Sequence, residues 1–326
     1  MPGFTMGRRG IFASAAATLL ASPAAAQDNY PTRPVRLVVP NPAGGSGDTI
    51  TRIIGDRLAV ELGGQVIVEN RPGAATTIGT TAVARAEPDG YTLLSLPSSG
   101  LVQTVLRSRL PFDLTRDFAP VIGIGSIPLV LVAASAANLR SIDDVRRAAR
   151  SGAGVSYGSG GAGTIGHISG ARLLSEIGGR GTHVPFRGNA EVLQAMAGGH
   201  VQMMFASVAE VPPLVAAGHL RAIGLTAAAR DPALPDTPTM RELGFTDFEP
   251  STWYAFLAPA RTPQPILARL SAGFTRALGD ATVQAKLRDL SFTTQLRNPE
   301  QLAAFLREEA QAWGKVVREN NLTAAD

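Results

Sequence analysis

The chain has 326 residues, no cysteine and a formal net charge of +4. The absence of cysteine excludes disulfides, thiolate chemistry and cysteine-ligated metals. The small positive excess is spread along the chain without basic clusters, which argues against nucleic acid as the main partner and is compatible with a small anionic ligand.

Residues 1–26 have the pattern of an export signal. Arg8 and Arg9 supply a positive start, residues 11–23 form an apolar core too short to span a bilayer, and Ala24–Ala26 resemble a small-residue cleavage site. The alternative is a disordered or tagged N-terminus. We predict that this signal peptide is removed and that the remainder is a soluble protein of the periplasm. The paired arginines leave the Sec and twin-arginine routes both open.

Beyond residue 26, short β-rich runs alternate with amphipathic helical stretches, which is typical of a mostly parallel α/β sheet. Helices are expected in most of the gaps between strands. The predicted strands are Val35–Val39, Val66–Glu69, Thr92–Ser95, Leu129–Ala133, Val155–Tyr157, His183–Pro185, Met203–Ala206, Ala222–Leu225 and Trp253–Leu257.

Four predicted helix starts have capping signals. Ser141 precedes two aspartates, and Thr239 with Glu242 forms the pattern of a capping box, in which a hydroxyl oxygen accepts from free N–H groups of the first turn. Thr262–Pro263 and Asn298–Pro299 each place a cap residue before a proline at the first helical position.

The last helix is predicted from Pro299 to about Asn320, with one apolar stripe that packs on the core. The stripe consists of Leu302, Phe305, Leu306, Ala310, Trp313, Val316 and Val317.

The strand pattern predicts two domains that are built from three consecutive segments of the chain. Residues 27–128 together with 251–326 are predicted to form domain 1, and residues 129–250 domain 2. A chain that crosses twice between domains has a two-strand hinge, which suits closure around a ligand.

A glycine-rich turn follows the first strand, in the stretch Pro40–Thr49. Gly44, Gly45 and Gly47 allow a close backbone approach, and the helix that follows begins with free N–H groups that attract an anion. Residues that could cap this helix are Ser46, Asp48 and Thr49. The alternatives are a phosphate site, an oxyanion site and a tight turn without a ligand.

A second turn of the same kind, Gly158–Thr164, follows the strand at Val155 and has the spacing G-x-G-x-x-G. A nucleotide-dependent α/β enzyme is therefore an alternative. The acidic residue that should end the next strand of a dinucleotide fold is missing, because that strand is followed by Arg187, and Glu176 falls on the helix.

No other motif predicts chemistry. A Walker loop and a G-x-S-x-G elbow are absent, and the four histidines lack metal-ligand spacing. We therefore predict no catalytic residue, no metal and no cofactor. His167 falls in the first helical turn after the second glycine turn, where it is either a packed or capping residue or a ligand contact. Two glycine-rich helix starts, one in each domain, suit a carboxylate, or a dicarboxylate that bridges them.

Five stretches of the chain resemble, in order, the Bug-type receptors, which are the substrate-binding proteins of tripartite tricarboxylate transporters. They include "ENRPGA", "GSGGAGTIGH" and "LPDTPTMRELG", and the resemblance covers nearly all of the chain after residue 26. It implies a type II periplasmic binding protein that closes on a small organic acid, acts as a monomer and presents the acid to a membrane transporter pair or a sensor. The remaining alternative is an interaction protein that has lost ligand binding.

The resemblance also implies the ligand-binding positions. The two turns of the family hold a carboxylate, and they correspond here to Pro42, Ala43, Gly44, Gly45, Ser46, Asp48, Ser159, Gly163, Thr164 and His167. Two positions depart from the family pattern. Asn41 stands where an aromatic or apolar residue is frequent, and Ala206 stands where an aspartate is frequent. Both are expected to bear on the part of the ligand other than its carboxylate.

Overall fold

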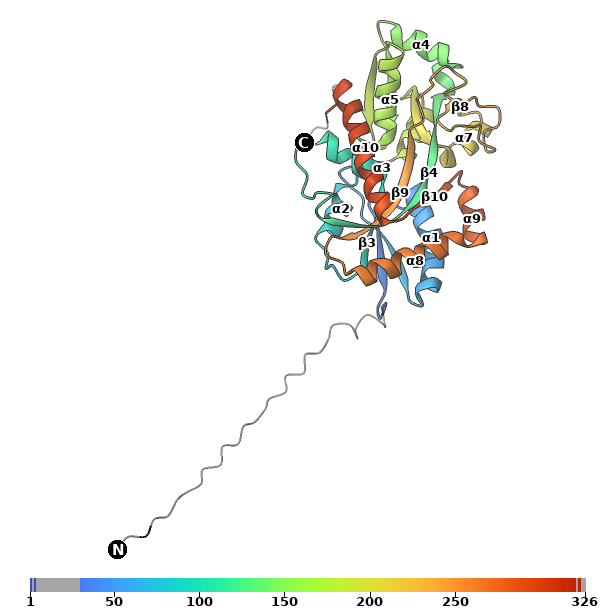
Figure 1. Ribbon diagram of the computed structural model, residues 1–326. Coiled ribbons are helices and arrows are strands. Elements are labelled where there is room, and N and C mark those ends of the chain that lie inside the picture. The colour runs from blue at the N-terminus through green and yellow to red at the C-terminus, as the bar shows by residue number, and fades with distance from the viewer. Residues whose placement is uncertain (2, 4–29, 321, 324–326) are drawn as a thin grey trace. The chain divides into compact units, whose positions relative to one another are not determined.

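The computed structural model describes residues 1, 3, 30–320, 322 and 323, and the predicted export signal lies almost entirely outside them (Figure 1). The chain divides into a segment that ends at Tyr30 and a folded unit from Pro31 to Asp326, and the fold below is that of the second unit. Within the described residues, no helix has the length and hydropathy needed to span a bilayer.

All nine predicted strands are present, most of them longer than predicted. In chain order the strands are β1 (Val35–Val39), β2 (Val66–Asn70), β3 (Thr92–Pro97), β4 (Phe118–Ala134), β5 (Val155–Ser159), β6 (Gly181–Pro185), β7 (Met203–Ser207), β8 (Leu220–Leu225), β9 (Ser251–Pro259) and β10 (Thr293–Arg297). The sequence pattern does not predict β10 or the first eleven residues of β4.

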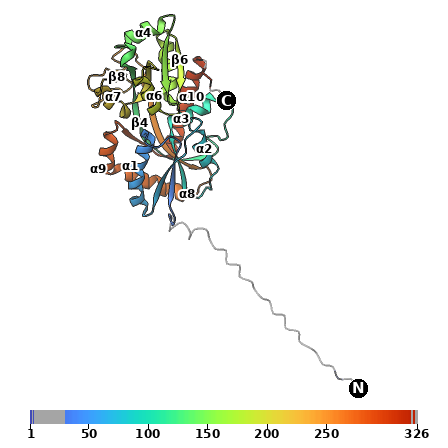
Figure 2. The same cartoon turned by 180° about the vertical axis from the view of Figure 1, so that it is seen from behind.

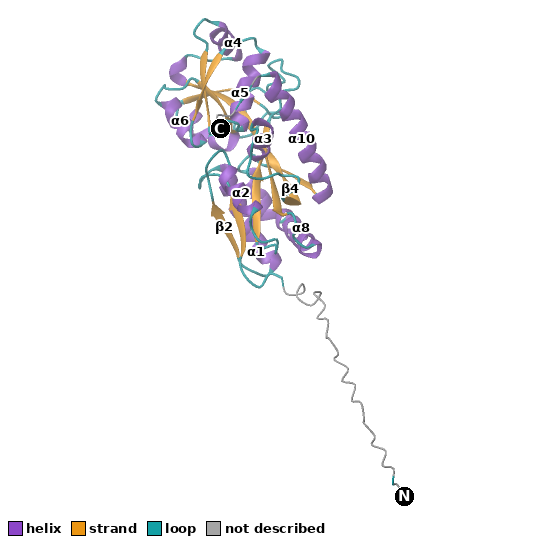
Figure 3. Ribbon diagram, turned by 90° about the vertical axis from the view of Figure 1, so that its left-hand side faces the viewer, coloured by secondary structure: helices purple, strands orange, loops and turns teal. Residues whose placement is uncertain are grey.

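Helices occupy most of the gaps between the strands, and Figure 3 shows them on both sides of the sheet. They are α1 (Ser46–Leu62), α2 (Thr77–Ala84), α3 (Ser98–Leu106), α4 (Ile142–Arg150), α5 (Ile165–Glu176), α6 (Asn189–Ala197), α7 (Pro212–Ala216), α8 (Gln264–Gly279), α9 (Ala281–Arg288) and α10 (Pro299–Glu319), with 3-10 turns at Ser135–Ala137 and Val208–Glu210.

Strand β4 joins two halves of the sheet. Up to Pro128 it pairs with β9 and β10, and from Leu129 onward it pairs with β7 and β8. We call β1, β2, β3, β9, β10 and the first part of β4 the first half-sheet, and β5 to β8 with the rest of β4 the second half-sheet. In Figure 2, α1 and α8 lie beside the first half-sheet and α4 and α6 beside the second.

The sheet is mixed rather than mostly parallel. The outer pairs β1–β2, β1–β3, β5–β6 and β5–β7 are parallel, but every pair that includes β4 or β9 is antiparallel. The reason is that β9 returns from the second half-sheet and runs against β3 and β4, side by side with β4 in Figure 1.

The second part of β4 packs on two cores through its alternating side chains. Leu129 and Leu131 belong to a large cluster of buried residues, and Val130 and Val132 belong to a second cluster on the other face. This alternation follows from the two-residue period of a strand. A strand buried on both faces needs a continuous apolar run, which explains why this part of β4 is easy to recognise in the sequence.

The predicted capping bonds are present at three of four positions, and at two of these a helix follows. Ser141 accepts from the N–H of Asp144, and Asn298 forms a complete capping box with Gln301 at the start of α10. Thr262 does not cap α8, because the cap residue is Pro263 and the Thr262 hydroxyl donates to the Pro259 carbonyl. Thr239 and Glu242 do exchange both capping-box bonds, but only a turn follows, since Gly244 takes a positive φ of 94°.

Helix α10 packs on the core as predicted. Leu302, Trp313 and Val317 are buried, and the rest of the predicted stripe is partly buried against the large cluster. Its Glu309 carboxylate accepts from two indole N–H groups, at 2.6 Å from Nε1 of Trp253 on β9 and at 3.0 Å from Nε1 of Trp313. The bond from Trp253 connects the helix to β9, and the bond from Trp313 lies within α10.

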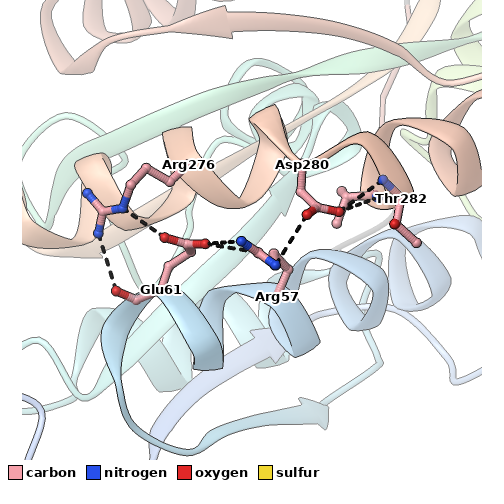
Figure 4. A network of polar contacts seen from close by, with 6 residues as sticks. Arg57, Glu61, Arg276, Asp280 and Thr282 are labelled. Carbon is pink, nitrogen blue, oxygen red and sulfur yellow. Dashed lines mark hydrogen bonds and ion pairs between the residues drawn. The ribbon is translucent and has the colours of Figure 1, made fainter.

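A chain of charges holds α1 against α8 and α9 (Figure 4). Oε1 of Glu61 accepts from Nε of Arg57 at 2.9 Å, and Oε2 accepts from Nε of Arg276 at 2.8 Å. Arg57 Nη1 also lies 3.2 Å from Oδ2 of Asp280, and the other oxygen of Asp280 caps α9 by accepting from the N–H of Thr282. The network joins the C-terminal half of α1 to α8 and to the start of α9.

Candidate functional site

The first glycine turn connects β1 to α1. Gly44 has a φ of 82°, and its N–H donates to Oδ2 of Asp48 at 2.9 Å. Asp48 is buried, and its Oδ1 lies 2.9 Å from Nη2 of Arg52. Burial alone would raise the pKa of Asp48, but the bonds from Arg52 and from the Gly44 N–H hold that pKa below its usual value. Asp48 is therefore ionised, and its carboxylate stabilises the conformation of the turn.

The start of α1 keeps unused donors. Within the described residues, no hydrogen bond involves the N–H groups of Gly45, Ser46 or Gly47. A β-carbon on Gly47 would lie 3.0 Å from the Tyr254 ring, which shows how closely β9 approaches this turn. The first N–H groups of a helix carry the positive end of its dipole, so they attract an anion.

The second glycine turn connects β5 to α5 and is braced from inside. The Gly163 N–H donates to Nδ1 of His167 at 3.0 Å, and Oγ1 of Thr164 accepts from the N–H of His167 at 3.4 Å. Gly163 has a φ of 78°, and a β-carbon there would collide with Gln103 on α3. Ser159 donates to or accepts from Nε2 of His183 at 2.7 Å. Ile165 and Gly166 keep N–H groups that no bond between described residues uses.

His167 and His183 are stacked with ring centroids 3.8 Å apart. Burial lowers the pKa of His167 to about 4, and burial together with the charge of His167 lowers the pKa of His183 to about 3. Both rings are therefore neutral at pH 7. The observed contacts of His167 are those of a packed and capping residue.

A cavity of about 540 Å³ lies between the two turns. Four helix N-termini contribute to its wall, namely Ser46 and Gly47 of α1, Ser98 and Ser99 of α3, Thr164 to Gly166 at α5, and Asn189 with Ala190 at α6. The volume is in the range of small-molecule sites. The starts of α1, α3 and α6 have no side-chain cap, and the buried Oγ of Ser98 has no hydrogen-bond partner among the described residues.

The structure places seven of the predicted site residues in the wall of this cavity. They are Asn41, Pro42, Ala43, Gly44, Gly45, Ser46 and Thr164. The other predicted residues do not line it, and these are Asp48, Ser159, Gly163, His167 and Ala206. The first four brace the two turns. Ala206 is fully buried on β7 opposite Val130, within the second core cluster.

Sequence reasoning missed the starts of α3 and α6 and two charged residues. Arg187 is exposed at the cavity and Glu210 is partly buried in it, and neither forms an ion pair with a described residue. A signal for α3 existed, because "LPSSG" follows a strand as the two glycine turns do. No local sequence pattern identifies Glu210 as a residue of the cavity wall, because its place there depends on the path of the chain after β7.

Two further hollows are less suited to an anion. One, of about 680 Å³, lies over α4 and α5, where Arg146 and Arg172 are bound to Asp143 and Glu176 and Arg150 donates to the Ile177 carbonyl. The other, of about 630 Å³, borders α8 and has a mainly apolar wall. Among the described residues, no three His, Asp or Glu side chains are grouped so that they could hold a metal ion.

Comparison with known proteins gives consistent likenesses. Residues 50–322 match the family model described as "Tripartite tricarboxylate transporter family receptor". The chain is 36% identical to the "UPF0065 protein in tcbD-tcbE intergenic region" of Pseudomonas sp. strain P51, over 98% of this chain and 96% of that protein.

Two solved structures extend the likeness to three dimensions. The periplasmic binding protein BugD matches with a TM-score of 0.83 and 29% identity, over 90% of this chain and 99% of BugD. MatC from Rhodopseudomonas palustris, solved with bound malate, matches with a TM-score of 0.82 and 33% identity, over 88% of this chain and all of MatC. These matches confirm the predicted Bug-type resemblance and the mixed α/β fold of a periplasmic binding protein.

Proposed function

This chain belongs to the tripartite tricarboxylate transporter receptor family, and we propose that it captures a small carboxylate-containing compound in the cavity between its two half-sheets. As a member of this family it is a receptor and not the nucleotide-dependent enzyme that the G-x-G-x-x-G turn left open. Structural neighbours that are periplasmic binding proteins support a periplasmic location. We further propose that its export signal is removed, that it is a monomer, and that it delivers its ligand to a membrane transporter or a sensor.

The observation that carries this proposal is the convergence of four helix N-termini on one cavity. The uncapped N–H groups at the starts of α1, α3 and α6 offer donors to an anion. The bound malate of MatC, a protein of the same family fold, is an acid of a size that such a cavity accommodates. Asp48, Ser159, Gly163 and His167 then act by holding the turns in place.

Closure of two domains around the ligand is part of the proposal. Residues 27–128 with 251–326 would form one domain and residues 129–250 the other. The switch of partners along β4 at Pro128 and the return of the chain into β9 at Ser251 support a hinge of two strands. Because the cavity takes residues from both half-sheets, a ligand there would stabilise the closed arrangement.

A thermal-shift and calorimetry screen of the purified protein against small organic acids, starting with malate, tests the proposal. A true ligand at a hundredfold excess over its Kd should stabilise the fold by about 2.7 kcal/mol. Stabilisation by a nicotinamide dinucleotide but by no acid would contradict the proposed carboxylate ligand. If neither class stabilises the protein, the interaction-protein alternative gains support.

A pair of variants at one residue locates the site. Gly45 has a φ of −78°, which proline can adopt, and a β-carbon there would meet only the Pro42 carbonyl oxygen at 3.6 Å. Gly45→Pro removes one N–H group from the start of α1 and should weaken acid binding at least tenfold. Gly45→Ala keeps that N–H and should bind within about threefold of the natural protein. Equal affinities for both variants would place the ligand elsewhere.

A further inference from the structure

Glu210 is the acidic residue in the wall of a cavity that otherwise suits an anion. It ends the 3-10 turn that follows β7, and it is the one Asp or Glu among the described residues that line this cavity. The helix N-termini attract an anion to this cavity, whereas the fixed negative charge of Glu210 repels one. The presence of that charge therefore requires a physical explanation.

The carboxylate of Glu210 is held from two sides. Ser46 Oγ donates to Oε1 at 2.9 Å, and Asn189 Nδ2 donates to Oε2 at 2.9 Å. Ser46 begins α1 and Asn189 begins α6, so the donors come from opposite half-sheets. Each carboxylate oxygen can accept more than one hydrogen bond, and each therefore retains accepting capacity toward the cavity.

The surroundings keep Glu210 as the single anionic group on this wall. Burial, and after it the charge of Glu210, raise the pKa of Tyr254, so the neighbouring phenol remains neutral. No described cation forms an ion pair with Glu210. A second carboxylate close to it would be repelled, whereas an ammonium, amide or hydroxyl group would be attracted.

We propose that Glu210 determines which acids this receptor accepts, by requiring a hydrogen-bond donor on the part of the ligand that faces it. The ligand turns its carboxylate to the helix N-termini and its donor, best of all an ammonium group, to Glu210. This inference rests on the proposed function and specifies the substrate class as acids that carry a hydrogen-bond donor, best of all amphoteric acids, rather than simple dicarboxylates.

Acids of equal length provide the test. Isothermal titration calorimetry of the full chain would compare succinate with 3-aminopropanoate, glutarate with 4-aminobutanoate and adipate with 5-aminopentanoate. At the length that fits, the amino acid should bind at least tenfold more tightly than the diacid. Glu210→Gln keeps the shape of the side chain but removes the charge, and it should reduce that ratio to within about threefold or reverse it.

A matched control removes the same charge elsewhere. Glu87 is exposed and does not line the cavity, so Glu87→Gln should keep the natural preference. The thermal unfolding of each variant would be recorded first, and the ratio in the natural protein tests the idea even if Glu210→Gln does not fold.

Three results would be decisive against the inference. Diacids that bind the natural protein as well as the amino acids overturn it while leaving the receptor function intact. An equal gain in affinity for both probe classes in Glu210→Gln overturns it too, since Glu210 would then compete with the ligand for Ser46 and Asn189. Failure of every acid to bind the natural protein refutes the proposed function itself, and the inference with it.

Discussion

At the scale of single residues, the stacked pair of His167 and His183 illustrates how burial sets chemical behaviour. Both rings are packed between β5, β6 and α5, and Tyr157 lies next to them, with ring centroids 5.1 Å from His183. Protonation of either ring would place a charge in an environment with little water. The pair therefore favours the folded state only while it is neutral.

Acidification should destabilise the protein through His167. Its folded pKa of about 4 lies below the ordinary value of 6.5, so the unfolded chain takes up a proton first as the pH falls. Stability contributed by the neutral ring is complete above pH 6.5 and declines between pH 6.5 and about 4. Thermal unfolding at pH 7 and pH 5 should show a loss of about 1–2 kcal/mol from this group.

The variant His167→Gln provides the comparison. It removes the ring at position 167 but keeps His183, whose pKa is also lowered, so the loss between pH 7 and pH 5 should become smaller without disappearing, although the variant is less stable at pH 7. Carboxylates with lowered pKa values, such as Asp48, lose their contribution only at lower pH and do not affect this window. An unchanged pH dependence in the variant would mean that other groups cause the decline.

The sequence predicts which residues lie at the candidate site, but it does not predict what each side chain does there. The glycines and the strand-to-helix pattern identify the first turn, and seven predicted residues line the cavity. The sequence does not reveal that Asp48 takes up the Gly44 N–H, which leaves the next three N–H groups as the open ones. Nor does it show that Ala206 faces the core, because one residue of register decides which face of β7 a side chain occupies.

At the scale of elements, the network that holds α1 to α8 and α9 should contribute little to stability. Hydrogen bonds from Arg276 and then from Arg57 hold the pKa of Glu61 below its usual value. These groups are close to solvent, which screens their attraction. Glu61→Gln should lower Tm by no more than about 2 °C and leave acid binding unchanged, as differential scanning calorimetry and titration would measure.

A larger effect in Glu61→Gln would be informative. If acid affinity falls together with Tm, the orientation of α1 depends on this network more than its exposure indicates. Arg146→Gln on α4 is a suitable control, because it breaks a surface ion pair with Asp143 that lies away from α1.

A strand or helix could be predicted from the sequence where its local composition favours the structure that it adopts in the fold. The first part of β4 contains Pro120, Gly123, Gly125 and Pro128, which normally interrupt a strand. In the fold these residues form irregular pairing with β9, and Gly125 lets β10 pass so closely that a β-carbon would collide with the Thr293 carbonyl. Partners distant in sequence create this strand, so a local pattern cannot reveal it.

At the scale of the whole molecule, β4 and β9 link the two halves that contribute to the cavity. If these strands act as a hinge, an acid that binds should make the protein more compact. Small-angle X-ray scattering should then show a smaller radius of gyration with saturating ligand. The Gly45→Pro variant should need at least a tenfold higher acid concentration for the same change, and an unchanged radius in the natural protein despite binding would argue against closure.

The convergence of four helix starts is also a property of the whole molecule. Ser98 and Asn189 are 91 positions apart, and only Ser98 has a local signal, the strand-to-helix pattern of "LPSSG". Only the order of strands across the sheet brings α3 and α6 to the cavity that α1 and α5 also border. The sequence therefore predicted two of the four helix starts, and the missing two required the complete topology.

The two indole rings that donate to the Glu309 carboxylate make the intrinsic tryptophan fluorescence of this protein a probe of one location. They are the only tryptophans in the chain, and both report on one location where α10 meets β9. Trp253 lies between Thr252 and Tyr254, which both line the cavity. Intrinsic fluorescence therefore reports, without any attached dye, on the strand that borders the cavity, and a rearrangement of β9 should change the emission.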